Sequence, residues 1–96
     1  MKRHYVYILS SQRNGTLYVG STSDLIKRVF EHKNKLVFGF TDKYNVFRLV
    51  YFEEHENYVE AARREKRLKN WCRQWKLNLI EEKNPHWNDL YEELLG

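Results

Sequence analysis

The chain has 96 residues, too few for a second hydrophobic core, so we expect a single domain. Hydrophobic residues make up 42% and aromatic residues 16% of the sequence, which favours a packed core over disorder. No apolar run approaches the roughly 18 residues that span a bilayer, and the apolar part of MKRHYVYILSS ends too early for a signal peptide. The single cysteine, Cys72, has no partner for an internal disulfide. These features predict a cytoplasmic protein.

Positive charge is concentrated in one segment. The net charge is +4, but residues 61–76 hold seven basic residues and one acid, giving +6, whereas the remaining chain carries −2. A concentrated basic surface fits a polyanion such as nucleic acid, although charge alone supports a solvated helix face equally well. The candidate nucleic-acid-binding residues are Arg63, Lys66, Arg67, Lys69 and Arg73.

The first 20 residues predict a β-hairpin. HYVYILS (4–10) and TLYVG (16–20) have the aromatic and β-branched residues typical of strands. Asn14-Gly15 between them is a type I′ turn signal. With this two-residue turn, paired residue numbers sum to 29, and Tyr7 and Tyr18 share one face of the sheet. Four apolar residues then point to the other face: Val6, Ile8, Leu17 and Val19.

A helix and a third strand are expected next. STSD (21–24) offers hydroxyl groups for an N-cap, with Asp24 in the first helical turn. Arg28 and His32, four residues apart, share a line beside the core face. Residues 34–43 look like a loop, and YNVFRLVYFEE (44–54) looks like a strand buried on both faces. The predicted core face of the helix consists of Leu25, Ile26, Val29 and Phe30.

The second half of the chain is expected to be helical. Asn57 followed by Glu60 resembles a capping box, and Asn84-Pro85 ends the helical region. Residues 86–95 look like a short closing helix. The predicted fold is α+β, a small three-stranded antiparallel sheet flanked by helices in the order β-β-α-β-α plus a C-terminal helical tail. This region is expected to form either one helix or two helices broken near residues 70–73. A continuous stripe at helical spacing runs along it through Ala61, Glu65, Leu68, Cys72, Trp75 and Leu79.

Glu65 is the unusual member of this stripe. An unpaired buried carboxylate is costly, so Glu65 must be paired, protonated or bound to a metal. The simpler explanation is an ion pair with a nearby Arg or Lys. The functional explanation is a ligand for a hard divalent cation, with substrate phosphate oxygens and waters completing the shell. The paired His and Cys spacings of a structural zinc site are missing, as are a glycine-rich phosphate loop and a GxSxG motif.

These residues resemble a known pattern. YVYIL (5–9) and YVG (18–20), followed by Arg28 and His32, look like the GIY-YIG nuclease domain. EAARRE (60–65) resembles the second-helix motif of that family, whose closing glutamate, here Glu65, binds the metal. The tail KLNLIEEKNPHWNDL resembles the small stand-alone bacterial members. The chain departs from the pattern by having Tyr5 at the first glycine and valine at both isoleucines. Three residues compete for the asparagine of some members: Asn70, Asn78 and Asn84.

The resemblance implies an endonuclease that hydrolyses DNA phosphodiester bonds with one Mg²⁺ or Mn²⁺ ion. Glu65 would hold the metal, and Arg28 would stabilise the charge that develops on the phosphate. Tyr7 or Tyr18 would orient or deprotonate the attacking water, and His32 would act as a proton shuttle or phosphate contact. We expect these five residues to converge on one cleft over the sheet face that carries the tyrosines.

The resemblance also implies how the chain is organised and what it meets. Residues 1–83 would form the nuclease-like domain and residues 84–96 a helical tail packed on it. The substrate would be DNA, cut in a structure-selective way in repair or recombination, and a protein partner would supply specificity. Neither a membrane nor a nucleotide cofactor is implied. The alternative is a nucleic-acid-binding module that has the nuclease fold but little or no turnover. A third hypothesis, a protein-interaction domain that uses the basic helix, is the least favoured.

Overall fold

The computed structural model describes residues 3–37 and 39–96. Met1, Lys2 and Phe38, which belong to the predicted N-terminal segment and to the predicted loop, lie outside the described residues. Within them, every helix is too short or too polar to cross a membrane. The elements are β1 (His4–Ser10), β2 (Leu17–Thr22), α1 (Leu25–Lys33), α2 (Phe40–Lys43), β3 (Arg48–His55), α3 (Tyr58–Asn70), α4 (Arg73–Lys83) and α5 (Tyr91–Leu95).

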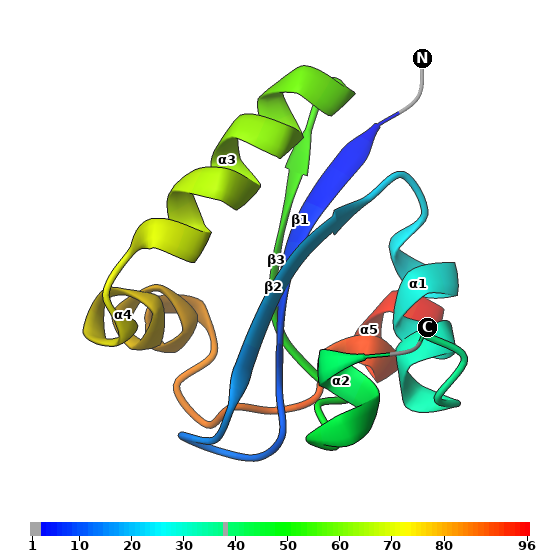
Figure 1. Cartoon of the computed structure of the whole chain (residues 1–96), viewed down its shortest axis with the longest axis vertical. Coiled ribbons are helices and arrows are strands. Elements are labelled where there is room, and N and C mark those ends of the chain that lie inside the picture. Colours follow the sequence, from blue (N-terminus) through cyan, green and yellow to red (C-terminus); the bar gives the residue numbers. More distant parts are fainter. Residues whose placement is uncertain (1–2, 38) are drawn as a thin grey trace.

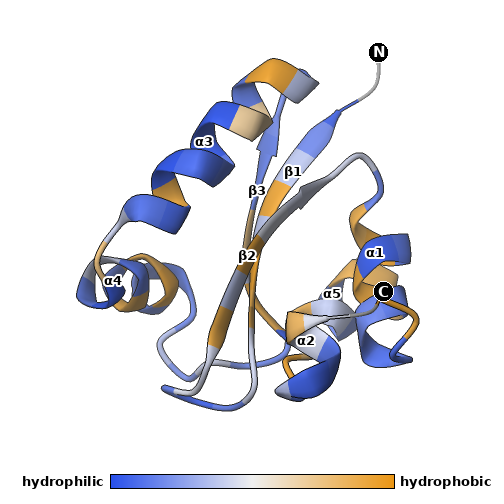
Figure 2. Ribbon diagram, viewed as in Figure 1, coloured by the Kyte–Doolittle hydropathy of each residue, from blue (hydrophilic) through white to orange (hydrophobic). Residues whose placement is uncertain are grey.

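The sheet is antiparallel with strand order β2-β1-β3, and helices cover both of its faces. In Figure 1, α3 and α4 lie on one side of the sheet and α1, α2 and α5 on the other. The central strand β1 is buried on both faces, as its unbroken aromatic and aliphatic run suggests. Val6 and Ile8 pack into the cluster on the α3 side, and Tyr7 and Leu9 into the cluster on the α1 side. Figure 2 shows the apolar residues concentrated along the sheet. The predicted α+β class is confirmed.

The hairpin loop is longer than predicted. The Ser11 N–H donates to the Thr16 carbonyl at 3.0 Å, so four residues, 12–15, form the loop. Within the loop, the Gly15 N–H donates to the Gln12 carbonyl at 2.9 Å, and Asn14 has a positive φ of 58°. A type I′ turn needs positive φ at both of its central residues, and of Asn14 and Gly15 only Asn14 has it. The predicted two-residue turn is therefore wrong.

The predicted orientation of the tyrosines is nevertheless correct. Tyr7 pairs with Gly20 and Leu9 with Tyr18, so paired numbers sum to 27 instead of 29. Because the loop is longer by two residues, the alternation of side chains is unchanged. Tyr7 and Tyr18 share the face that packs against α1.

The structure corrects the buried face of α1. Ile26 is 42% and Phe30 49% exposed, while His32 is buried together with Leu25 and Val29. Leu25, Val29 and His32 stand at positions i, i+4 and i+7 of the helix, so they share the face that packs against the core. Asp24 is the N-cap itself and not a first-turn residue, since its side chain accepts from the Lys27 N–H at 3.1 Å.

Three further segments differ from the prediction, and the long stripe follows one of its two alternatives. The segment 34–43, predicted as a loop, contains the short helix α2, and β3 begins at Arg48 instead of residue 44. The long stripe is two helices, because residues 71 and 72 have extended backbone between α3 and α4. Trp75 and Cys72 of the stripe are exposed, Leu79 is partly buried, and the two fully buried members, Ala61 and Leu68, both lie in α3. The closing helix covers residues 91–95 only, whereas the Asn57 cap of α3 and the end of α4 before Asn84 are confirmed.

Candidate active site

A buried tyrosine on the central strand anchors the site. The Tyr7 side chain is almost completely buried, and its hydroxyl lies 3.1 Å from His32 Nε2. The hydroxyl also lies directly over Gly20 of the neighbouring strand. A Cβ atom at Gly20 would come within 2.6 Å of it, so glycine at this position makes room for the phenol.

His32 connects Tyr7 to a third buried side chain. Its Nδ1 lies 2.9 Å from the Thr41 hydroxyl of α2, so in either tautomer the ring bridges two hydroxyl groups. Burial, with a further contribution from the positive charge of Arg28, lowers the pKa of His32 to about 4. The ring is therefore neutral at pH 7. His32, predicted as a proton shuttle or phosphate contact, is 1% exposed, as is Tyr7.

The phenol of Tyr7 is held in its protonated form. Burial is the largest cause of the upward shift in its pKa, and the neighbouring Tyr18 and the negative charge of Glu65 add to the shift. The positive charge of Arg28 opposes this shift. Tyr7 is therefore a neutral hydroxyl whose acidity depends on the positive charge brought close to it.

Tyr18 and Arg28 complete this side of the site. The Tyr18 ring lies 5.5 Å from the His32 ring, 6.3 Å from the Tyr7 ring and 6.2 Å from the Phe40 ring, measured between centroids. The Arg28 guanidinium is partly exposed, with Nε 3.2 Å from a carboxylate oxygen of Glu31 on the next turn of α1. An exposed ion pair of this kind is weak and yields readily to a phosphate oxygen.

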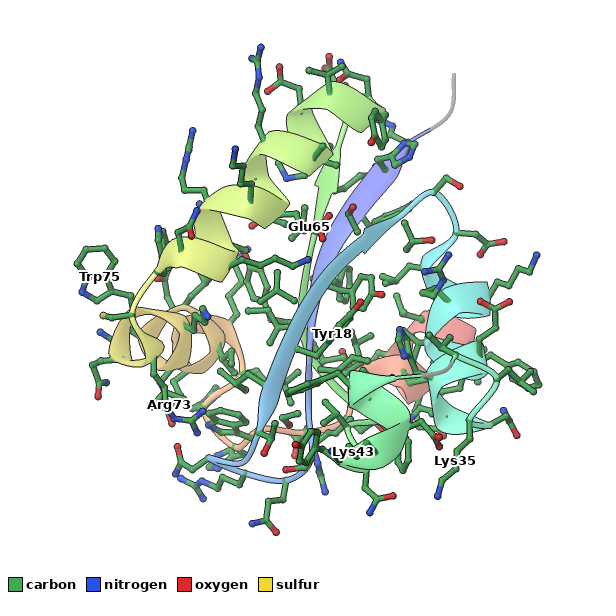
Figure 3. All side chains as sticks on the ribbon, viewed as in Figure 1. Tyr18, Lys35, Lys43, Glu65, Arg73 and Trp75 are labelled. Carbon is green, nitrogen blue, oxygen red and sulfur yellow. The ribbon has the colours of Figure 1, made fainter. Side chains whose placement is uncertain are left out.

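Glu65 approaches from the other side of the edge strand. Its Oε1 accepts a hydrogen bond of 2.5 Å from the Ser21 hydroxyl, and its Oε2 lies 2.7 Å from Lys69 Nζ. Ser21 follows Gly20 in β2, and because side chains alternate along a strand it faces α3. Figure 3 shows Glu65 between α3 and β2, with Tyr18 on the other side of the β2 ribbon.

The structure thus brings four of the five candidates together on one face. Tyr7, Tyr18 and His32 are in contact there, and the charge of Arg28 acts on two of them. The expectation that Glu65 shares this face is wrong, because α3 packs on the opposite layer. Glu65 is still close enough to influence the pKa of Tyr7. Tyr7 and Tyr18 contact Gly20 of the edge strand on one face, and Glu65 contacts Ser21 on the other.

The donor set fits a divalent cation only in part. Among residues 3–37 and 39–96, no group of three or more His, Cys, Asp and Glu side chains is placed to hold a metal. Glu65 offers one partly exposed carboxylate, and hard cations such as Mg²⁺ or Mn²⁺ prefer carboxylate oxygen. The residues therefore fit a cation whose remaining ligands are phosphate oxygens and waters.

The five predicted nucleic-acid-binding residues divide into those without and those with a partner in the fold. Arg63, Lys66 and Arg67 are exposed, and among the residues that the structure describes they form no ion pair. Lys69 pairs with Glu65. Arg73 Nη2 donates to the carbonyls of residues 14 and 15 at 2.7 Å each, so its side chain braces the hairpin loop. Figure 3 shows Arg73 close to that loop.

The three candidate asparagines all have other partners. Asn84 is buried, and its Nδ2 donates to the carbonyls of Val50 and Asn88, while its Oδ1 accepts from the Asn88 N–H. Asn70 and Asn78 are exposed and hydrogen-bond within their own helices. Asn84 fastens the end of α4 to β3, which is a structural role.

Two residues that touch the site were missed in the sequence. Thr41 lies in a segment without hydrophobic periodicity, which gave no signal that its hydroxyl would be buried against His32. Ser21 belongs to the segment that predicts a helix cap, whereas its hydroxyl donates to Glu65. Each contact joins two different elements, α1 with α2 and β2 with α3, and spacing within one element does not reveal such contacts.

Comparison with known proteins identifies the family. The model of the GIY-YIG catalytic domain matches residues 3–78. A UPF0213 protein of Staphylococcus saprophyticus is 38% identical over 82 residues, which cover 85% of this chain and 99% of that protein. A UPF0213 protein of Staphylococcus aureus is 37% identical over 83 residues, covering 86% of this chain and 100% of the relative.

The solved structures include a similar fold. The solution NMR structure of a UPF0213 protein from Bacillus halodurans superposes with a TM-score of 0.56 at 31% identity, covering 91% of this chain and 92% of that one. The matched segment of the catalytic-domain model contains Tyr7, Tyr18, Arg28, His32 and Glu65. The chain belongs to the GIY-YIG catalytic domain family, together with small UPF0213 proteins of bacteria.

Proposed function

We propose that this chain is a divalent-metal-dependent endonuclease that hydrolyses phosphodiester bonds of DNA. The observation that carries the proposal is the buried chain of hydrogen bonds from Tyr7 through His32 to Thr41, set beside Arg28. Glu65 faces the same strand segment from the other layer. In-line hydrolysis needs an oriented water, relief of charge on the phosphate oxygens and help for the leaving oxygen, and these side chains supply groups for each need.

Tyr7 orients the attacking water and takes its proton, while the phenol proton moves to Nε2 of His32. Its hydroxyl is fixed by His32, so its oxygen can accept a hydrogen bond from the water while its own proton points to Nε2. In this tautomer, Nδ1–H donates to the Thr41 hydroxyl. Because burial raises the pKa of Tyr7, proton transfer becomes favourable only when positive charge approaches the phenol.

Arg28 supplies positive charge from the protein itself. Its guanidinium exchanges Glu31 for a phosphate oxygen and donates to the charge that develops in the transition state, a role typically worth about 2.7–4 kcal/mol. Glu65 and the hydroxyl of Ser21 would hold the cation, which when bound would withdraw charge from the phosphate and stabilise the leaving oxygen.

One observation favours a second candidate, a nucleic-acid-binding module with little turnover. Lys69 already neutralises Glu65, with its Nζ 2.7 Å from Oε2. If this pair persists when DNA is bound, the carboxylate is a structural partner of the basic helix and the chain binds without cutting.

A Glu65→Gln variant distinguishes the two candidates. Supercoiled, single-stranded and branched DNA are incubated with Mg²⁺ or Mn²⁺ and wild-type protein, Glu65→Gln or the control Glu82→Gln, whose side chain is exposed on α4. The endonuclease proposal expects cleavage by wild type and the control, and loss of cleavage with retained DNA binding in Glu65→Gln. Binding without cleavage by wild type supports the second candidate, and equal cleavage by all three proteins removes Glu65 from the mechanism.

A further inference from the structure

A pocket of about 330 Å³ lies across the edge strand, directly beside the candidate active site. Its volume is within the range of sites that hold small organic groups. Residues from both layers line it, so it joins the tyrosine side of β2 to the α3 and α4 side. The lining residues are Leu17, Tyr18, Val19, Phe40, Lys69 and Lys76.

One wall of the pocket is aromatic. Phe40, from the short helix α2, stacks on Tyr18 with ring centroids 6.2 Å apart and an interplanar angle of 28°. A third ring, that of Tyr44, lies 4.8 Å from Phe40. Phe40 nevertheless remains 44% exposed. An aromatic ring left in water beside a pocket is available to stack with another flat ring.

The opposite wall carries positive charge. Lys69 projects from α3 and Lys76 from α4, and the side chain of Lys69 is half exposed despite its contact with Glu65. Two ammonium groups facing a row of aromatic rings match a phosphate attached to a planar base. Because Tyr18 belongs to both the pocket and the candidate active site, an occupant of the pocket is adjacent to the scissile bond.

We propose that this pocket is a subsite for one unpaired nucleotide of the strand being cut, and this inference rests on the proposed function. The base stacks against Phe40, and the adjoining phosphate lies between Lys69 and Lys76. A base within a duplex is already stacked and paired, so it reaches Phe40 only after it is extruded from the helix. The subsite therefore favours single-stranded or flapped DNA over continuous duplex. Base stacking on aromatic side chains is tolerant of sequence, so little base preference follows.

Binding without metal tests the subsite separately from cleavage. The probe is a fluorescently labelled single strand of about 12 nucleotides, within the usual site sizes for such binding. Its affinity is compared with that of the same strand in blunt duplex, by anisotropy in EDTA. Phe40→Ala should weaken single-strand binding by about 5- to 150-fold, while duplex binding should change by less than about twofold. Phe40→Leu keeps the apolar bulk against Tyr18 and should lose nearly as much, whereas Phe40→Trp should retain affinity.

The matched control is Phe30→Ala, which removes a similarly exposed phenylalanine from α1. Lys76→Gln provides an independent arm, because loss of one phosphate contact should flatten the slope of log K against log salt by about 0.7 on a single strand. Lys83→Gln, at the far end of the same helix, should leave the slope unchanged.

The outcomes separate the subsite from the nuclease proposal. If wild type cleaves DNA but Phe40→Ala and Phe30→Ala bind both probes alike, the subsite is wrong and the nuclease proposal stands. If duplex and single-strand affinities fall together in Phe40→Ala, the pocket does not discriminate unpaired bases and the inference is again overturned. If the Phe40 and Lys76 variants behave as expected while wild type never cleaves, the subsite stands and the proposed catalysis fails.

Discussion

Tyr7 and His32 carry the chemistry of the proposed site, yet both are as buried as core residues. Burial raises the pKa of the phenol and lowers that of the imidazole to about 4, so each is neutral at pH 7. Their hydrogen bond, continued to Thr41, satisfies three polar side chains that would be costly to bury alone. The same contacts hold the phenol in position and stabilise the fold.

The depressed pKa of His32 predicts a dependence of stability on pH. In the unfolded chain its pKa is near 6.5, so between about pH 6.5 and 4 only the unfolded state takes up this proton. The free energy of unfolding should therefore fall as pH drops through this window, by up to about 3 kcal/mol from His32. Urea denaturation of wild type and His32→Gln at a series of pH values measures the difference.

His86→Gln serves as the control, because that histidine is exposed. It should follow the wild-type pH profile, whereas His32→Gln should be flatter. The carboxylates contribute equally to all three proteins and cancel in the comparison. Parallel profiles for wild type and His32→Gln would mean that the imidazole is not held neutral.

At the scale of elements, Asn84 fastens the end of α4 to the sheet. It makes three hydrogen bonds, including one to the Val50 carbonyl of β3, within a buried environment. Asn84→Ala leaves these partners unsatisfied, and we expect a loss of about 3 kcal/mol in the free energy of unfolding. Asn78→Ala, on the exposed side of α4, should change it by less than about 0.5 kcal/mol. Denaturant titrations measure both changes.

Nuclease activity of the Asn84 variant decides whether this asparagine has a second role. The hydrogen bonds of Asn84 go to backbone groups of Val50 and Asn88 and not to Tyr7 or Glu65. The activity per folded molecule should therefore equal that of wild type. A large loss of activity in the folded fraction would instead make Asn84 part of the site.

The exposed cations of α3 predict an electrostatic contribution to DNA binding. With 3.6 residues per turn, Arg63 projects roughly opposite the buried Ala61, and Lys66 and Arg67 lie on the flanks. If four to six phosphates of a duplex are neutralised, log K should fall with log salt with a slope of about −4 to −5. Replacing Arg63, Lys66 and Arg67 together by Gln should flatten the slope by up to about 3.

A charge-matched control replaces Lys35, Lys43 and Lys83 by Gln, because these three are also exposed but lie outside α3. Anisotropy titrations over a range of salt concentrations compare the two triple variants. Equal slopes in both would show that net charge, and not the face of α3, drives binding.

At the scale of the whole molecule, the sequence predicted the fold class and the boundaries of β1, because the aromatic and aliphatic run of β1 ends where the polar loop begins. It predicted that Tyr7 and Tyr18 share a face, although the loop differs by two residues. It did not predict that Glu65 lies on the opposite layer. Spacing within α3 fixes which residues share a helix face, but the sheet face that α3 covers is decided by tertiary packing. Spacing likewise does not reveal the contacts of Thr41 and Ser21, because each binds a residue of another element, His32 of α1 and Glu65 of α3.

The last prediction concerns metal binding and the stability of the whole domain. A cation that binds only the folded state raises the melting temperature by mass action. Each 1 kcal/mol gained corresponds to about 4–8 °C for a domain of this size. Millimolar Mg²⁺ or Mn²⁺ should therefore raise the melting temperature of wild type and leave Glu65→Gln unmoved, with NaCl of equal ionic strength as the reference. Because Lys69 occupies one oxygen of Glu65, the cation must displace it. Lys69→Gln removes this competitor and should respond at lower metal concentration than wild type. If Lys69→Gln and Glu65→Gln both respond as wild type does, the cation binds elsewhere and the role assigned to Glu65 is wrong.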